Sequence, residues 1–148
     1  MQRLDEAGIA YVVRRHSRPV FTVEEAAAER GVSAGQIVKV VVVRKSDRTL
    51  AAALLPGDRK LSLKKLSAAL GDKRICMAPP ALIEQTTGMT VGAISAAGLP
   101  AGMPIYVDEG VARQAQVAIS SGDPEAGLLL ASSDLLKLVG GVRGDFAA

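Results

Sequence analysis

Lys39 is the residue best suited to chemistry, because it is the one charged side chain in an aliphatic run at residues 37–43. The run is mostly β-branched, which is typical of a strand buried on both faces. Side chains alternate along a strand, so Lys39 shares one face with Val41 and Val43. An ammonium group placed there is costly unless it meets a partner, a ligand or solvent. Two interpretations stay open: a functional amine, or a structural lysine whose stem packs while its head reaches solvent.

A segment of small residues and a lone histidine are the other candidates. Residues 88–100 are rich in glycine and alanine and show little periodicity. Glycine lets backbone N–H groups approach a ligand closely, where they can hold a carbonyl or a developing oxyanion. The ordinary alternative is a flexible loop. His16 is the only histidine, and the alternative to a functional role is a surface or capping position.

Several common mechanisms lack their parts in this sequence. One histidine excludes a two-histidine metal site, and a Ser–His–Asp triad would need His16 without a G-x-S-x-G motif. Neither glycine-rich nucleotide motif occurs. Cys76 is the only cysteine and follows Ile75 in a short apolar stretch, so we expect a buried, unreactive thiol and no disulfide. We expect no metal ion and no cofactor.

The composition predicts one domain, residues 1–148, with an aliphatic core, since apolar residues are 49% and aromatics only 3%. The net charge is +3, unevenly spread. Residues 1–74 hold 15 of 18 Lys+Arg and 8 of 15 Asp+Glu, a net +7, whereas residues 75–148 hold 3 and 7, a net −4. A basic half favours an anionic partner such as nucleic acid, although basic side chains also decorate solvated surfaces. The acidic start lacks a signal-peptide core and no apolar run is long enough to span a membrane, so we expect a cytoplasmic protein.

Strands and helices are expected to interleave irregularly, which favours an α+β domain around a mixed sheet. Thr22 and Ser62 are predicted N-caps, and Ser33 begins a weaker capping box. The last helix is predicted to be capped by Ser132 or Ser133. Strands are expected at residues 10–14, 37–43, 49–55, 74–77, 103–107, 116–119 and 127–130, and helices at 23–30, 63–70, 79–87 and before Gly140.

Taken together, these segments resemble a known family across nearly the whole chain. The most specific parts are the Lys39 strand and the block P-G-D-R-K-L-x-L-K-K-L at residues 56–66. The other matching segments are His16 and residues 21–27, 84–88, 91–95, 104–108 and 133–138. They are similar to the prolyl-tRNA-synthetase editing-domain family, the YbaK-like aminoacyl-tRNA deacylases.

The resemblance implies a single compact domain, with a curved mixed β-sheet and surrounding helices, that hydrolyses the ester joining a wrong amino acid to tRNA. Lys39 inherits the role of the family's key polar residue. Gly92 matches the glycine of a G-x-x-x-P loop whose backbone amides meet the aminoacyl group, so both residues are assigned to catalysis. Since both must reach one ester, we expect the loop at residues 92–96 to face the Lys39 ammonium across a cleft. Ala96 stands at the proline position of this loop, and Ala97 replaces a usual Phe. The expected substrate-binding residues are His16, Phe21, Thr22, Ala93, Ile94, Ser95 and Ala96.

We therefore expect a free-standing deacylase acting in trans on a small amino acid, such as alanine, serine or cysteine, on tRNA(Pro) or a related tRNA. Its partners would be the acceptor end of aminoacyl-tRNA and an aminoacyl-tRNA synthetase, with no membrane. The expected tRNA contacts are Arg14, Arg15, Arg18, Lys60, Lys64 and Lys65. Two alternatives remain: a catalytically silent tRNA- or aminoacyl-binding module, for instance a regulatory one, and an interaction protein that uses the pocket for a partner.

Overall fold

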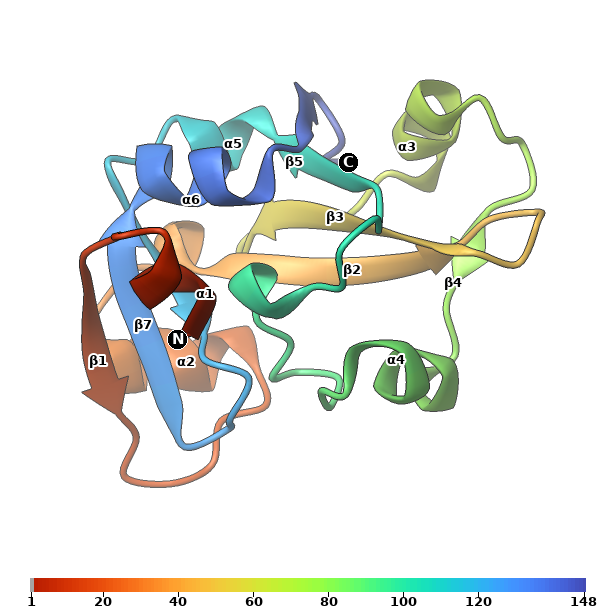
Figure 1. Cartoon of the computed structure of the whole chain (residues 1–148). Coiled ribbons are helices and arrows are strands. Elements are labelled where there is room, and N and C mark those ends of the chain that lie inside the picture. Colours follow the sequence, from red (N-terminus) through yellow and green to blue (C-terminus); the bar gives the residue numbers. More distant parts are fainter. Residues whose placement is uncertain (1) are drawn as a thin grey trace.

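A β-hairpin of two long strands crosses the middle of the molecule (Figure 1). The computed structural model describes residues 2–148. β2 (Val38–Arg44) pairs antiparallel with β3 (Leu50–Pro56), as the β-branched run and the following turn predict. β5 (Ile105–Asp108) and β8 (Val142–Gly144) continue the sheet in parallel, and β4 (Cys76–Met77) pairs with the end of β2. The order is β4-β2-β3-β5-β8, so this sheet is mixed, as expected.

A second, antiparallel sheet stands beside the first. Its order is β1 (Tyr11–Arg15), β7 (Ala126–Ala131) and β6 (Gln116–Ser120). One bridge between Ile37 and Ala118 joins the two sheets just before β2 begins. The strands of the α+β domain are therefore divided between two sheets that meet at the start of the Lys39 strand.

Helices cover both faces of the larger sheet (Figure 1). Leu66 of α3 packs with Val43 on one face, while Ile83 of α4 packs with Val38 on the other. β3 lies between these layers and is buried along its whole length. The helical bounds are α1 Gln2–Glu6, α2 Val23–Arg30, η1 Ala34–Gln36, α3 Leu63–Leu70, α4 Pro80–Thr87, η2 Ala96–Gly98, α5 Glu109–Ala112 and α6 Ser132–Val139.

The predicted caps of α2 and α3 are confirmed. The side chain of Thr22 accepts from the Glu25 N–H, and that of Ser62 accepts from the Lys65 N–H. The predicted cap of α6 is wrong, because Ala131 occupies the N-cap. Ser132 is instead the first helical residue, and its buried hydroxyl donates to the Val111 carbonyl at 2.9 Å.

The prediction for Cys76 is also wrong, and three short elements were not predicted from the sequence. Cys76 is exposed, because β4 is a two-residue edge strand and its thiol is not covered. α1, α5 and β8 are each no longer than five residues, too short for periodicity to reveal. None of the helices within residues 2–148 combines the length and apolar character that a membrane crossing needs.

Asp108, at the end of β5, holds the C-terminal segment through hydrogen bonds. We therefore expect its substitution to lower the stability of the protein strongly. It is buried, and its carboxylate accepts from the N–H groups of Gly110 and Phe146, both at 2.9 Å, and of Ala147 at 3.1 Å. Asp108→Ala leaves two buried donors and one partly buried donor unpaired, so we expect the free energy of unfolding to fall by roughly 2–4 kcal/mol in urea titrations. Glu84→Ala, on an exposed site, is the control, with an expected change below about 0.5 kcal/mol. Equal losses in the two variants would contradict this role.

Candidate active site

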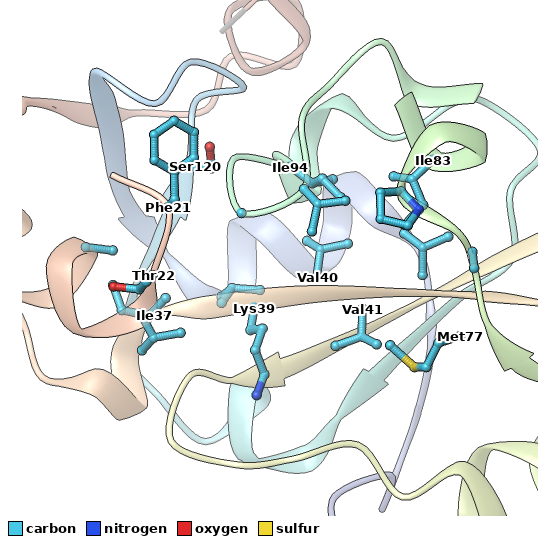
Figure 2. A pocket seen from close by; sticks show the side chains of 18 of the residues that line it. Phe21, Thr22, Ile37, Lys39, Val40, Val41, Met77, Ile83, Ile94 and Ser120 are labelled. Atoms are coloured by element: carbon cyan, nitrogen blue, oxygen red, sulfur yellow. The ribbon is translucent and has the colours of Figure 1, made fainter. Parts of the chain in front are cut away.

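A cavity of about 420 Å³ opens where the two sheets meet, between α2 and α4. Figure 2 shows Phe21 and Ser120 on one side of it and Ile83 and Ile94 on the other, with β2 running beneath. Most of its wall is aliphatic, and Lys39 and Arg30 are the charged residues in it. Its lining residues are Phe21, Thr22, Val23, Ala26, Arg30, residues 37–42, Met77, Ala78, Pro80, Ile83, Val91, Gly92, Ile94 and Ser120.

The cavity follows an unpaired edge of β2, which explains why five successive residues of this strand, and Ile37 just before it, line the cavity. β4 pairs with β2 only at Val43 and Arg44. The last contact on this side is the Ala78 N–H donating to the Val42 carbonyl at 3.1 Å. Backbone groups alternate along a strand, so the N–H and C=O of Val40 point to the same edge. No strand within residues 2–148 pairs with Val40 there, so the cavity offers main-chain donors and acceptors within an apolar wall.

Lys39 lines this cavity, but its ammonium is turned to the opposite face of β2. Figure 2 shows the side chain leaving the strand away from Val40 and Ile94. The ammonium donates to the backbone carbonyl of Arg59. The expectation that the ammonium faces the loop at residues 92–96 is therefore not met in this conformation.

The surroundings of Lys39 favour its neutral form more than water does. Burial lowers the pKa of the Lys39 amine, and the positive charge of Lys60 lowers it further, while Asp58 and Glu24 act in the opposite sense. No carboxylate forms an ion pair with Lys39 within residues 2–148. The amine is thus held by one neutral carbonyl and is free to exchange that partner for a ligand.

The loop opposite β2 presents two free backbone amides. Gly92 and Ile94 line the cavity, and their N–H groups have no hydrogen-bond partner in the part of the chain that the structure describes. Gly92 has φ +94°, and a Cβ atom there would lie 2.7 Å from the Phe21 carbonyl oxygen. Only glycine fits this backbone conformation and this close approach, which fix the loop against the start of α2.

Three of the predicted substrate-binding residues lie behind the cavity wall. Ala93, Ser95 and Ala96 are buried and do not line the cavity. The Ala93 N–H donates to the Thr90 carbonyl at 2.9 Å, and its carbonyl accepts from the Ser120 hydroxyl at 3.0 Å. These residues hold the loop in place, while Ile94 between them reaches the cavity.

Phe21 and Thr22 both line the cavity, at the start of α2. Phe21 is 49% exposed, so its ring is available to a ligand. The Thr22 hydroxyl is already engaged, since it accepts from the Glu25 N–H at 3.2 Å and lies 3.0 Å from the Glu25 carboxylate. Of these two residues, Phe21 has the freer side chain.

His16 lies outside the cavity and contacts it only through another residue. Its Nε2 is 3.4 Å from the Nε of Arg30, which does line the cavity. Arg30 and Ser120 are cavity residues that the sequence did not reveal. The spacing offers a signal for Arg30, since it lies four residues after Ala26 and therefore on the same face of the predicted helix. Ser120 ends a strand that carries no motif.

The six predicted tRNA-binding residues do not form a single group. Arg14 and Arg15 are exposed on β1, whereas Lys64 is exposed on α3, on the opposite side of the molecule (Figure 1). Lys60 is exposed and near enough to Lys39 for its charge to lower the pKa of that amine. Arg18 lies 3.7 Å from the Glu25 carboxylate. Lys65 is the least free of the six, because its ammonium binds Asp145 at 2.9 Å and the Ala147 carbonyl at 2.7 Å.

No group of three or more His, Cys, Asp or Glu side chains within residues 2–148 is arranged to hold a metal ion. The groups at the cavity are instead the Arg30 guanidinium and the backbone amides of Gly92 and Ile94, with the Lys39 amine on the other face of β2. Such groups stabilise negative charge on oxygen and are suited to acyl chemistry.

Comparison with known sequences agrees with this chemistry. Residues 17–138 match the aminoacyl-tRNA editing domain. A protein of Enterococcus faecalis named as a candidate Cys-tRNA(Pro)/Cys-tRNA(Cys) deacylase, EbsC, is 30% identical over 121 residues, which cover 82% of this chain and 74% of that protein. The prolyl-tRNA editing protein ProX of Acetoanaerobium sticklandii is 28% identical over 142 residues, covering 93% of this chain and 86% of ProX. The proline–tRNA ligase of Thermosipho melanesiensis is 35% identical over 96 residues, but these cover only 17% of the ligase.

Solved structures confirm the predicted α+β architecture. The crystal structure of a hypothetical protein superposes with a TM-score of 0.92 at 26% identity, covering 99% of this chain and 97% of that one. A crystal structure described as a candidate trans-editing enzyme for prolyl-tRNA synthetase gives a TM-score of 0.88 at 26% identity, with coverage of 99% and 93%. The sequence match spans most of the chain and the fold match nearly all of it. The chain therefore belongs to the aminoacyl-tRNA editing domain family, the YbaK-like aminoacyl-tRNA deacylases.

Proposed function

We propose that this protein hydrolyses the ester of mischarged aminoacyl-tRNA in trans, and that it removes a small amino acid from tRNA(Pro) or a related tRNA. The observation that carries the proposal is the cavity that combines Lys39 with the free amides of Gly92 and Ile94. The match to the editing domain over residues 17–138 supports the reaction class. The similarity to ProX over 86% of its length supports action in trans.

The reaction requires stabilisation of the oxyanion that forms when the ester carbonyl is attacked. The N–H groups of Gly92 and Ile94 are suited to hold that oxygen, since they are preorganised and lie against an apolar wall. The nucleophile is a water molecule or the adjacent ribose hydroxyl. An ester is already activated, so positioning these groups suffices without a catalytic triad.

Lys39 joins this arrangement by leaving the Arg59 carbonyl. Its four-carbon stem is flexible, and no strand within residues 2–148 pairs with β2 at Val40, so we propose that the side chain passes around this edge of β2. Within the cavity, the ammonium would neutralise the developing charge on the ester. Substrate binding and the release of Lys39 from Arg59 are thus parts of one step.

A panel of charged tRNAs tests the proposed function and its preference together. The cavity of about 420 Å³ must hold the terminal ribose and the ester as well as the amino-acid side chain, so a bulky side chain is excluded sterically. We expect Ala-, Ser- and Cys-charged tRNA to be deacylated at least about tenfold faster than Phe-charged tRNA, with the tRNA body held constant. Release of Phe as fast as Ala would contradict the proposed preference for a small amino acid. No release from any charged tRNA would contradict the proposed deacylase activity.

That second outcome would favour a silent binding module of the same fold. Ala96 in place of the family's loop proline and the engagement of Lys39 with Arg59 favour this alternative. Tight binding of charged tRNA without turnover, in the same panel, would establish it.

The exposed basic residues are proposed to hold tRNA without selecting the amino acid, because phosphate contacts position a nucleic acid and do not read it. We expect Lys60→Ala with Lys64→Ala to weaken binding of all charged tRNAs alike, and to flatten the slope of log affinity against log salt by about 1.4–1.8. The matched control is Arg113→Ala with Lys137→Ala, two exposed residues of the acidic half that form no ion pair within residues 2–148. Lys65 is left intact because it binds Asp145 and the Ala147 carbonyl. A change in amino-acid preference at unchanged tRNA affinity would contradict this assignment.

A further inference from the structure

Arg30 is a charged residue that has no assigned role in the stability of the fold or in the proposed ester cleavage. It is the last residue of α2 and only 5% exposed, yet it lines the cavity. Arginine is almost never buried to this extent unless it is paired. The position of this guanidinium therefore needs an explanation.

The side chain of Arg30 is held between Gly127 and His16. It crosses β7 over Gly127, where a Cβ atom would lie 2.1 Å from Nε and 2.6 Å from Cδ. Beyond Gly127, Nε lies 3.4 Å from Nε2 of His16. The Nδ1–H of His16 donates to the Pro124 carbonyl at 2.7 Å, so Nε2 carries the lone pair that accepts from Arg30. Glycine makes the space, and a histidine of fixed tautomer orients the guanidinium.

The two terminal nitrogens of Arg30 are left without a partner. Within residues 2–148, no carboxylate forms an ion pair with it, and no hydrogen bond reaches either Nη atom. No fully enclosed side-chain nitrogen or oxygen in these residues lacks a hydrogen bond, so the Nη atoms are not sealed in the core. Because Arg30 lines the cavity, we infer that these nitrogens are exposed to it.

The charge of Arg30 is uncompensated but persistent. Burial lowers the pKa of the guanidinium to about 10, which still leaves it protonated at neutral pH. A buried charge without a partner destabilises the empty protein, and a ligand that supplies the opposite charge recovers that cost on binding. The planar fork of arginine matches two oxygens that share a negative charge.

We propose that Arg30 binds an anionic group of the substrate within the cavity. Its partner is a phosphate or carboxylate group carried by the 3′ end of aminoacyl-tRNA. The proposal rests on the proposed function, which supplies the ligand. Two sources offer this chemistry: the phosphate of the terminal nucleotide, and the side-chain carboxylate of an acidic amino acid. In either case Arg30 binds and orients the substrate and does not take part in ester cleavage.

Binding of probes that cannot be hydrolysed tests the proposal apart from catalysis. We compare the wild type with Arg30→Met, which keeps length and apolar packing, and measure dissociation constants by calorimetry. The probes are adenosine, AMP, and RNA minihelices whose 3′ end is free or carries alanine or aspartate through an amide link. Loss of one charge-assisted bond predicts a roughly 10- to 100-fold weakening of the affected probes.

The pattern of weakening identifies the source. A phosphate partner predicts that Arg30→Met removes the preference for AMP over adenosine and weakens all three minihelices equally. A carboxylate partner predicts that only the aspartate minihelix is weakened. Equal affinities of the two proteins for every probe would overturn the proposal, as would a wild type that binds none of them.

Two further measurements keep the test decisive. If Arg30→Met does not fold, the Nε–H resonance of Arg30 is followed by NMR in the wild type, and its invariance at saturating AMP and aspartate minihelix would overturn the proposal. Deacylation of Ala-charged tRNA by the wild type is measured separately. Failure of that assay with probe binding intact would reject the proposed function and leave the assignment of Arg30 standing.

Discussion

Lys39→Ala is expected to lower the rate of deacylation by at least about 100-fold, the usual effect of removing one group that stabilises a developing oxyanion. The expected effect on stability is small, because within residues 2–148 the ammonium makes one hydrogen bond, to the exposed Arg59 carbonyl, and no ion pair. Single-turnover hydrolysis of Ala-charged tRNA measures the first quantity, and thermal unfolding measures the second.

Two variants separate charge from geometry in this experiment. Lys39→Arg keeps the positive charge but changes the donor, so it is expected to recover only part of the rate. Lys45→Ala, in the turn after β2, removes a lysine that does not line the cavity and is expected to leave the rate unchanged. Near-normal turnover by Lys39→Ala would reject the catalytic role and return Lys39 to the structural interpretation.

Gly92→Val is expected to be the second most damaging substitution, again with a loss of about 100-fold or more in the deacylation rate. The new Cβ atom would collide with the Phe21 carbonyl oxygen, and the left-handed backbone at Gly92 disfavours a β-branched residue. The loop must then move, and the amides of Gly92 and Ile94 lose their alignment. We expect a stability loss of roughly 1–3 kcal/mol in urea titrations.

Gly88→Val is the matched control for this variant. Gly88 has φ +72°, but a Cβ atom there would have no neighbour within 4 Å, so the strain is similar and the collision is absent. Ala96→Pro is expected to be milder than Gly92→Val, because Ala96 begins η2 and Ser95 before it is extended, as a residue preceding proline prefers. An equal loss of rate at Gly88 and Gly92 would mean that strain alone, and not the placement of the amides, causes the effect.

Local signals in the sequence were enough to predict most of the elements that carry the site. The capping residues Thr22 and Ser62 set the starts of α2 and α3, and the β-branched run set β2, because these depend on neighbours in sequence. Ser132 and Cys76 were misjudged because their surroundings come from distant parts of the chain. A hydroxyl that finds the Val111 carbonyl, or a thiol on an uncovered edge, leaves no trace in local pattern.

The sequence predicted which residues lie at the cavity better than it predicted where the Lys39 side chain points. Lys39, Gly92, Phe21, Thr22 and Ile94 do meet in one cavity. Strand alternation correctly placed Lys39 on the face opposite Val40. The loop lies on the Val40 face, so the prediction that it faces the Lys39 ammonium is wrong. The unpaired edge that lets both faces of β2 line one cavity arises from the shortness of β4, which is a tertiary feature.

This unpaired edge of β2 also carries a risk for the solubility of the protein. An apolar strand edge with free backbone groups is a template for pairing with another chain, and proteins commonly cover such edges. Here α4 and the loop that contains Gly92 and Ile94 cover it, while leaving room for a substrate. Selection on these segments therefore acts on aggregation as well as on editing. Truncation or proteolytic cleavage within residues 79–94 would leave a protein that precipitates rather than one that is merely inactive.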